Sequence, residues 1–257
     1  MQISVAFPPG RDLVDYALLA ESLGYARVWV YDSPALYEDV WIALGAIAEN
    51  TDEIGFGPAV IVPSLRHVLV TAAAIATLEA QAPGRLAVAI GTGSTGRRAL
   101  GQKPLSIAVL ERYVRELRGL LAGETVRVDG AKIALLQSDG FGAPRPIRTP
   151  ILVAANGPKG LAVARELGDG VMCVGRPQPG FDWCATLAVG TVLEEGETFA
   201  SPRVFDALGP AIAMIYHAAW ESSPQSVDAL PDGAAWRAEI EALPADERHL
   251  AVHAGHA

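Results

Sequence analysis

The sequence is poor in cysteine and in long hydrophobic runs, and each shortage excludes a class of protein. Its 2 cysteines, Cys173 and Cys184, both lie in apolar segments. This argues against a disulfide framework or a cysteine-ligated metal and suits a reducing compartment. The first residues lack the basic and apolar regions of a signal peptide, and the apolar runs are interrupted well short of a membrane span. We therefore expect a cytoplasmic protein without a membrane partner.

Basic residues are also in short supply. Lysine and arginine number 20 against 29 aspartates and glutamates, a net charge of −9, which disfavours nucleic acid as a partner. The G-x-S-x-G, H-E-x-x-H and P-loop motifs are missing as well. His253 and His256 have metal-ligand spacing, but no Asp, Glu or Cys adjoins them, so we expect no metal site. Hydrophobic residues make up 51% of the chain, enough for a large core.

The chain does contain a regular alternation of strand and helix patterns. Strands are expected at residues 3–7, 28–31, 54–62, 86–90, 150–155, 171–174 and 185–192. Helices are expected at residues 12–24, 33–50, 67–81, 105–121, 158–168, 204–220 and 234–242. Distinctive residues gather where the strands end, which favours a (β/α)8 barrel over an open doubly wound sheet.

Three segments depart from this alternation. Residues 122–149 contain Asp129-Gly130 between short strand patterns, which predicts a hairpin insertion before the fifth strand. Gly57-Pro58, inside the third strand, predicts a bulge or distortion at residues 57–60. We find no eighth strand before Ala257, so either the barrel lacks its closing strand or the natural protein continues. Residues 1–257 are still expected to form a single barrel domain.

The turn after residues 150–155 carries the clearest candidate ligand site. Gly157 allows a ligand to approach the backbone, and Pro158 suits the first position of a helix. The free amides of the first helical turn, together with Lys159, would then form an anion site. The alternative is an ordinary short turn with a solvated lysine.

Other candidates lie near neighbouring strand ends. Residues 91–96 match G-x-G-x-x-G, but no helix is expected directly after them, so we interpret them as a ligand-covering loop and not as a dinucleotide fingerprint. Asp32 either hydrogen-bonds a heterocycle or is a turn residue. His67 is a candidate acid or phosphate ligand, with a capping or core-edge histidine as the alternative. Trp41 and Trp183 either form walls of a substrate pocket or pack in the core.

Taken together, several stretches resemble the bacterial luciferase-like superfamily, and within it the oxidoreductases dependent on the deazaflavin coenzyme F420, similar to methylenetetrahydromethanopterin reductase. The stretches occur in the family's order within residues 1–175. They are residues 27–33, 55–67, 84–93 and 154–160, followed by Asp169-Gly170.

The resemblance implies a (β/α)8 barrel that binds F420 at the carboxyl ends of its strands. Asp32 would contact the deazaflavin edge, and a cis peptide between Ala59 and Val60 would back the ring. The remaining residues expected to contact the cofactor are Gly91, Thr92, Gly93, Ala155, Asn156, Gly157, Pro158, Lys159 and Gly160, with its phosphate at residues 157–160. Ser33 replaces the histidine of related enzymes that act on sugars or alcohols. We assign it to the substrate pocket with Trp41 and Trp183.

These expectations define an enzyme that transfers a hydride between F420 and an unknown small-molecule substrate. We also expect a homodimer. An FMN-dependent monooxygenase of the same fold is the nearest alternative, because that branch shares the barrel. A binding protein without a cofactor is the alternative of another class.

Overall fold

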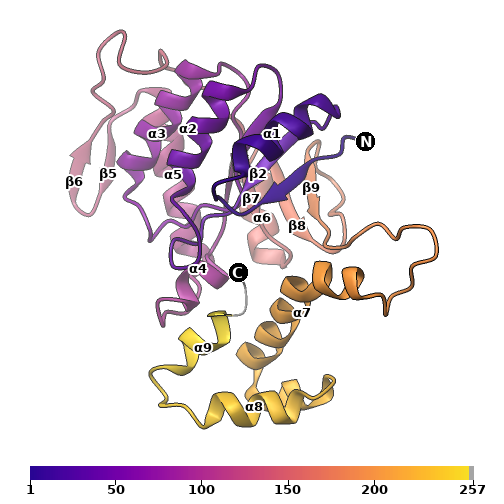
Figure 1. Ribbon diagram of the computed structural model, residues 1–257. Coiled ribbons are helices and arrows are strands. Elements are labelled where there is room, and N and C mark those ends of the chain that lie inside the picture. Colours follow the sequence, from indigo (N-terminus) through magenta and orange to yellow (C-terminus); the bar gives the residue numbers. More distant parts are fainter. Residues whose placement is uncertain (255–257) are drawn as a thin grey trace. The chain divides into compact units, whose positions relative to one another are not determined.

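The computed structural model describes residues 1–254, which gather into two compact units (Figure 1). Unit 1 comprises Met1–Gly96 and Pro104–Leu187. Unit 2 comprises Arg97–Lys103 and the chain from Ala188 onward. The single barrel domain expected over residues 1–257 stays a prediction.

The strands of unit 1 are parallel and follow one another in chain order. They are β1 (Val5–Phe7), β2 (Arg27–Val30), β3 (Gly55–Pro58), β4 (Val88–Ile90), β7 (Ile151–Ala154), β8 (Gly170–Val174) and β9 (Cys184–Leu187). β1, β2 and β3 pair in that order, as do β4, β7, β8 and β9. Isolated parallel bridges from Phe56 to Leu86 and from Ile61 to Ile90 connect β3 to β4. A doubly wound sheet reverses its strand order at a switch point, whereas this order has no reversal, as in a barrel.

Alternate residues of these strands face two different cores. Val88 and Ile90 of β4 belong to the larger apolar cluster, which includes buried helix residues, whereas Ala87 and Ala89 belong to a second cluster. This second cluster also contains Leu152 from β7. Because successive strand residues point to opposite faces, the second cluster is the interior of the barrel.

Helices connect successive strands, as the sequence predicts. They are α1 (Leu13–Ser22), α2 (Val40–Asn50), α3 (Val68–Gln81), α5 (Ile107–Ala122) and α6 (Pro158–Leu167). The predicted insertion is an antiparallel hairpin of β5 (Val126–Val128) and β6 (Ala131–Ile133). Its turn residues Asp129 and Gly130 have φ values of 47° and 85°, as a type I′ turn requires.

The start of α2 differs from the prediction. Ser33 and Pro34 form only a single turn, in which the Ser33 carbonyl accepts hydrogen bonds from the amides of Leu36 and Tyr37, and α2 begins later, at Val40. Asp39 is the cap instead, and its Oδ1 accepts from the amides of Trp41 and Ile42. A carboxylate that accepts two orphan helix amides fixes the helix start at this point.

A second difference concerns the G-x-G-x-x-G segment. A short helix, α4 (Ser94–Arg98), opens directly after Gly93 and contains Gly96. The expectation that no helix follows until about residue 105 was therefore wrong. The dinucleotide interpretation is still disfavoured, because that fingerprint belongs to a doubly wound sheet and the strand order here is that of a barrel.

Unit 2 is helical. It contains α7 (Pro202–Ser222), the 3-10 helix η1 (Pro224–Ala229), α8 (Gly233–Glu241) and α9 (Arg248–Ala254). Arg98 forms an ion pair with Glu221 in this unit. The helices expected at residues 204–220 and 234–242 are confirmed, and no strand follows β9 in the part of the chain that the structure describes.

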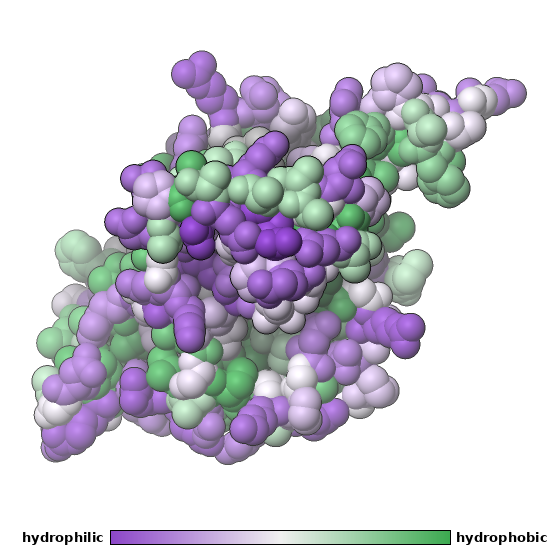
Figure 2. Space-filling model, turned by 90° about the horizontal axis from the view of Figure 1, so that it is seen from below, coloured by the Kyte–Doolittle hydropathy of each residue, from purple (hydrophilic) through white to green (hydrophobic). Residues whose placement is uncertain are grey.

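The surface mixes polar and apolar residues. Figure 2 shows patches of hydrophobic side chains among hydrophilic ones on one face of the molecule. In unit 2, the exposed large apolar side chains include Phe205, Ile212, Met214 and Ile215 of α7. Within residues 1–254, no helix has both the length and the hydropathy needed to cross a bilayer.

Candidate active site

The backbone after β3 takes the distorted course predicted for it. The peptide bond between Ala59 and Val60 is cis, as the family resemblance implies. The Ala59 amide donates to the Val30 carbonyl at 2.7 Å, and the Ile61 amide donates to the Ala89 carbonyl at 2.9 Å. The backbone thus changes its pairing partner from β2 to β4 across this bond.

Gly91 allows the ends of β3, β4 and β7 to approach one another closely. A Cβ atom on this glycine would lie 2.6 Å from Val60 Cγ2 and 3.3 Å from Ala154 Cβ. Gly93 has a φ of 77°, a conformation that side chains rarely adopt. The carbonyl of Thr92 between them accepts from the Leu105 amide at 2.9 Å. The two glycines are therefore required by packing and by backbone conformation.

Asp32 lies at the end of β2 and is buried in an ion pair. Its Oδ2 accepts from Arg66 Nη1 at 2.7 Å, and its side chain is 1% exposed. Burial raises the pKa of Asp32, and hydrogen bonds from Arg66 and from the Val62 amide oppose that rise. Two donors to a buried carboxylate favour its charged form.

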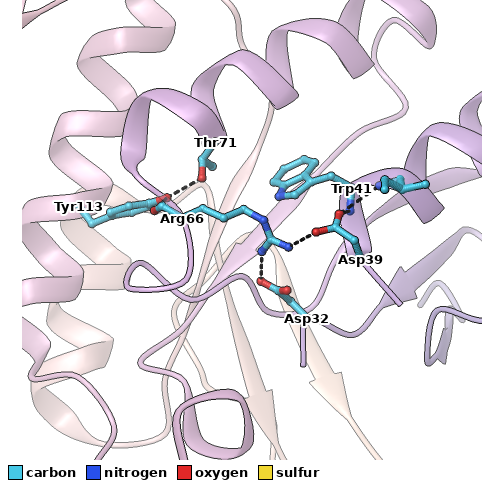
Figure 3. Close-up of polar contacts among 7 residues, drawn as sticks. Asp32, Asp39, Trp41, Arg66, Thr71 and Tyr113 are labelled. Carbon is cyan, nitrogen blue, oxygen red and sulfur yellow. Dashed lines mark hydrogen bonds and ion pairs between the residues drawn. The ribbon is translucent and has the colours of Figure 1, made fainter. Parts of the chain in front are cut away.

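Arg66 also binds a second carboxylate. Its Nη2 donates to Asp39 Oδ2 at 2.7 Å, and Figure 3 shows the guanidinium between the two aspartates. Burial alone would raise the pKa of Asp39, but the hydrogen bond and charge of Arg66 hold it below its ordinary value. We call Asp32, Arg66 and Asp39 the Arg66 clasp. Sequence reasoning missed Arg66 as a site residue, because only the fold brings it to Asp32.

The clasp adjoins a second buried polar pair. The Tyr113 hydroxyl lies 2.6 Å from Thr71 Oγ1, and it donates a longer hydrogen bond of 3.4 Å to the Arg66 carbonyl. Burial raises the pKa of Tyr113 to about 12. The phenol is therefore neutral at physiological pH, and it links α5 to the backbone of Arg66.

His67 and Trp41 have clear structural contacts. His67 caps α3, and its Nδ1 accepts from the Leu69 amide at 3.2 Å. Capping is the alternative role considered for His67, and its role as an acid stays a prediction.

Trp41 lies in the first turn of α2 with its ring beside Arg66 (Figure 3). Its buried Nε1 has no hydrogen-bond partner among the described residues. Ser33 is half-buried.

Trp183 lies at the opposite end of the strands from the other candidates. It precedes β9, its carbonyl accepts from the Val171 amide at 2.9 Å, and it sits against Gly170 at the start of β8. The Arg27 guanidinium stacks on its ring at 5.4 Å. The assignment of Trp183 to a pocket at the strand carboxyl ends is therefore corrected.

The turn after β7 has the predicted geometry. α6 begins at Pro158, Gly157 is the N-cap, and no side chain of the described residues caps the helix. Lys159 is exposed beside these amides. A Cβ on Gly160 would lie 2.8 Å from Ala155 Cβ, so this glycine lets the helix start close against the strand end.

Asn156 holds the neighbouring strand. Its Nδ2 donates to the Val174 carbonyl at 2.9 Å, and its Oδ1 accepts from the Val174 amide at 3.1 Å. The side chain thus continues the pairing of β7 with β8 beyond the strand. Its amide group is occupied, so within this turn the free donors belong to the start of α6.

The structure contains cavities near the amino end of β7 and between α3 and α5. One of about 490 Å³ lies near the amino end of β7, with Arg118, Ile147, Arg148 and Asp169 in its lining. One of about 160 Å³ is lined partly by Ser64, His67 and Tyr113. No group of three potential metal ligands occurs among residues 1–254. His256, the second member of the i, i+3 histidine pair, lies outside the described residues.

Comparisons with known proteins agree with this architecture. The sequence model of the luciferase-like monooxygenase family matches residues 2–255. An F420-dependent glucose-6-phosphate dehydrogenase of Beutenbergia cavernae is 34% identical over 184 residues, 63% of this chain and 52% of that protein. A 5,10-methylenetetrahydromethanopterin reductase of Methanolobus tindarius is 33% identical over 175 residues, 64% and 50% of the two chains. The chain thus spans about half the length of the curated relatives it matches.

Solved structures show the same fold. The coenzyme F420 dependent tetrahydromethanopterin reductase of Methanopyrus kandleri superposes with a TM-score of 0.67 at 17% identity, over 96% of this chain and 84% of that one. A monooxygenase of Streptomyces bottropensis also gives 0.67, at 20% identity over 98% and 96%. At these identities the likeness establishes the fold: an α/β protein of the luciferase-like, TIM-barrel type.

Proposed function

Because this chain belongs to the luciferase-like monooxygenase family, we propose that it is an F420-dependent oxidoreductase acting on a small molecule. The name of the first relative supports F420, and the names of both, a dehydrogenase and a reductase, support oxidoreduction. The observation that carries the proposal is the start of α6, where uncapped amides and Lys159 lie at a strand carboxyl end. An anionic cofactor group suits such donors.

The residues present fit the phosphate end of the cofactor. Gly157 adds no side chain at the exposed start of this turn, and Lys159 supplies a positive charge in a protein of net charge −9. Ala155 packs against Gly160, and Asn156 fixes the strand beside it. We assign the phosphate to the amides at the start of α6.

The residues also fit a flat ring. Ala59 and Val60 are half-buried and pack on the apolar interior of the barrel, and Gly91 adds no side chain beside them. We assign one face of the ring to this bulge, with Gly91, Thr92 and Gly93 along its border, and leave the other face to substrate. When bound, the deazaflavin supplies the hydride chemistry, and these residues orient it.

Titration with both candidate cofactors tests the proposal. Purified protein is expected to bind F420 with micromolar affinity or better, followed by the fluorescence of the deazaflavin, and to bind FMN more weakly. Micromolar FMN binding without F420 binding would establish the monooxygenase alternative. Binding of neither cofactor would favour the other alternative, a binding protein without a cofactor.

The substrate side of the proposal involves fewer residues. Ser33, in the β2–α2 connection, and Trp41, in the first turn of α2, are assigned to the substrate pocket, and His67 is kept as the candidate acid. The proposal includes a homodimer in the cytoplasm. Sedimentation of the purified protein at micromolar concentration tests the dimer. A monomer at that concentration would contradict the proposed homodimer.

A further inference from the structure

The carboxylate of Asp32 is closed off by its own protein partners. The side chain is 1% exposed, Arg66 donates to its Oδ2 at 2.7 Å, and the Val62 amide donates to it as well. A carboxylate held in this way has little surface left for a ligand. The contact to the deazaflavin edge that the family resemblance implies does not fit this arrangement.

Arg66, in the segment between β3 and α3, is bonded to both ends of the segment between β2 and α2. Nη1 binds Asp32 just after β2, and Nη2 binds Asp39 at the start of α2, each at 2.7 Å (Figure 3). Asp39 uses its other oxygen to cap α2. Two charge-assisted hydrogen bonds from one planar group fix direction as well as distance. The residues around Arg66 therefore cannot shift away from β2 without breaking these bonds.

The loop fixed by Arg66 is the one that carries the proposed ring support. Val60 lies six residues before Arg66 in the sequence. Between them, Ile61 donates to Ala89 at 2.9 Å and Leu65 donates to the Val62 carbonyl at 3.0 Å. The segment is thus held by β4 at its start and by the clasp at its end.

We propose that Asp32 is a positioning residue that acts through Arg66 to hold residues 59–66 in place, without touching the cofactor. Its consequence for cofactor binding rests on the proposed function. The holding of residues 59–66 does not, so the two parts can fail separately.

Hydrogen exchange of the protein without cofactor tests the clasp itself. Arg66→Met and Asp32→Asn are each expected to speed exchange of the amides in residues 59–66 by about tenfold or more, because local opening then breaks fewer bonds. Arg115→Met is the matched control, since Arg115 binds Glu111 and Glu166 on the exposed surface. Exchange that stays at the wild-type rate in both clasp variants would overturn the proposal.

A double-mutant cycle separates positioning from direct contact. Asparagine at position 32 keeps an oxygen that can accept from the Val62 amide but loses the charge that binds Arg66. If Asp32 acts through Arg66, the variant carrying both Asp32→Asn and Arg66→Met therefore loses no more F420 affinity than the worse single variant. If Asp32 touches the cofactor directly, the two fold-losses multiply, and the absorption spectrum of bound F420 changes in Asp32→Asn alone. Multiplied losses would overturn the proposal.

Arg66→Lys guards against a misfolded methionine variant. A lysine keeps the charge but cannot bridge both carboxylates as the planar guanidinium does, so we expect affinity and exchange between those of wild type and Arg66→Met. Wild-type affinity and exchange in Arg66→Lys would refute the bridging role. Should the wild-type protein bind no F420, the proposed function fails, and the exchange experiment alone still decides the clasp.

Discussion

The two ends of the strands in unit 1 are built in different ways. At the amino ends, Arg27 stacks on Trp29 and Trp183 and donates to the carbonyls of Phe56 and Arg85, each at 2.7 Å. At the carboxyl ends, the start of α6 leaves backbone amides without a side-chain cap among the described residues, near glycines and a cis peptide. The amino end is therefore closed by side chains that satisfy carbonyls, while the carboxyl end keeps donors for a ligand.

Two more charged side chains at the amino ends form hydrogen bonds with the backbone. Arg85 repeats the pattern of Arg27, because it donates to the carbonyls of Thr51 and Ile54 at 2.6 and 3.1 Å. Glu21 accepts from the three amides of residues 52–54 at 2.7–3.0 Å. Charged side chains at this end thus form hydrogen bonds with backbone groups, and these bonds stabilise the barrel. Enzymes of this fold place their chemistry at the other end.

The largest effect on stability is expected when the closed end is opened. Arg27→Met removes two charge-assisted hydrogen bonds to partly buried carbonyls, at roughly 1.5 kcal/mol each, so the free energy of unfolding should fall by about 3 kcal/mol. Burial lowers the pKa of Arg27 to about 10, so it stays charged at neutral pH. Urea unfolding measures the loss. Arg127→Met, in the exposed hairpin, is the control, and an equal change in both variants would contradict the role given to Arg27.

A smaller effect is expected at the open end from Gly91→Ala. The added methyl group would lie 2.6 Å from Val60 Cγ2, and such overpacking costs about 1–3 kcal/mol. F420 affinity should fall as well, because Val60 has to move. Gly45→Ala in α2 is the control, since a Cβ there meets nothing within 4 Å and favours the helix by up to about 1 kcal/mol. A stable Gly91→Ala variant with wild-type affinity would remove the close packing argued here.

A still smaller effect comes from pH and concerns Asp39 at the carboxyl end. The pKa of Asp39 is lowered in the folded protein, so its ionised form stabilises folding above its ordinary pKa of about 4, and this stabilisation is lost as pH falls through the folded value. Asp39→Asn keeps an acceptor for the α2 cap but not the charge. Its deficit in melting temperature at pH 6 should therefore shrink towards pH 3. A deficit independent of pH would show that only the cap matters.

The sequence is informative where structure depends on near neighbours. Asp129-Gly130 predicts the hairpin and Gly157-Pro158 predicts the helix start, because both depend on the conformations that those residues allow. The Arg66 clasp was missed because its members lie 34 residues apart for Asp32 and 27 for Asp39. Trp183 was misassigned although the sequence places it directly before the strand expected at residues 185–192. A residue that precedes a parallel strand lies at the amino end of the sheet, away from the proposed pocket.

The smallest effect on stability, and the most direct test of the open end, is expected from Lys159→Glu. The side chain is exposed at the start of α6, so unfolding should change little. A negative charge beside the proposed phosphate should nevertheless weaken F420 binding about tenfold, equivalent to about 1.4 kcal/mol. Lys132→Glu, on the exposed hairpin strand β6, changes the net charge equally and is the control in a fluorescence titration. Equal weakening in both variants would trace the effect to overall charge, and no weakening in Lys159→Glu would remove the anion site from this turn.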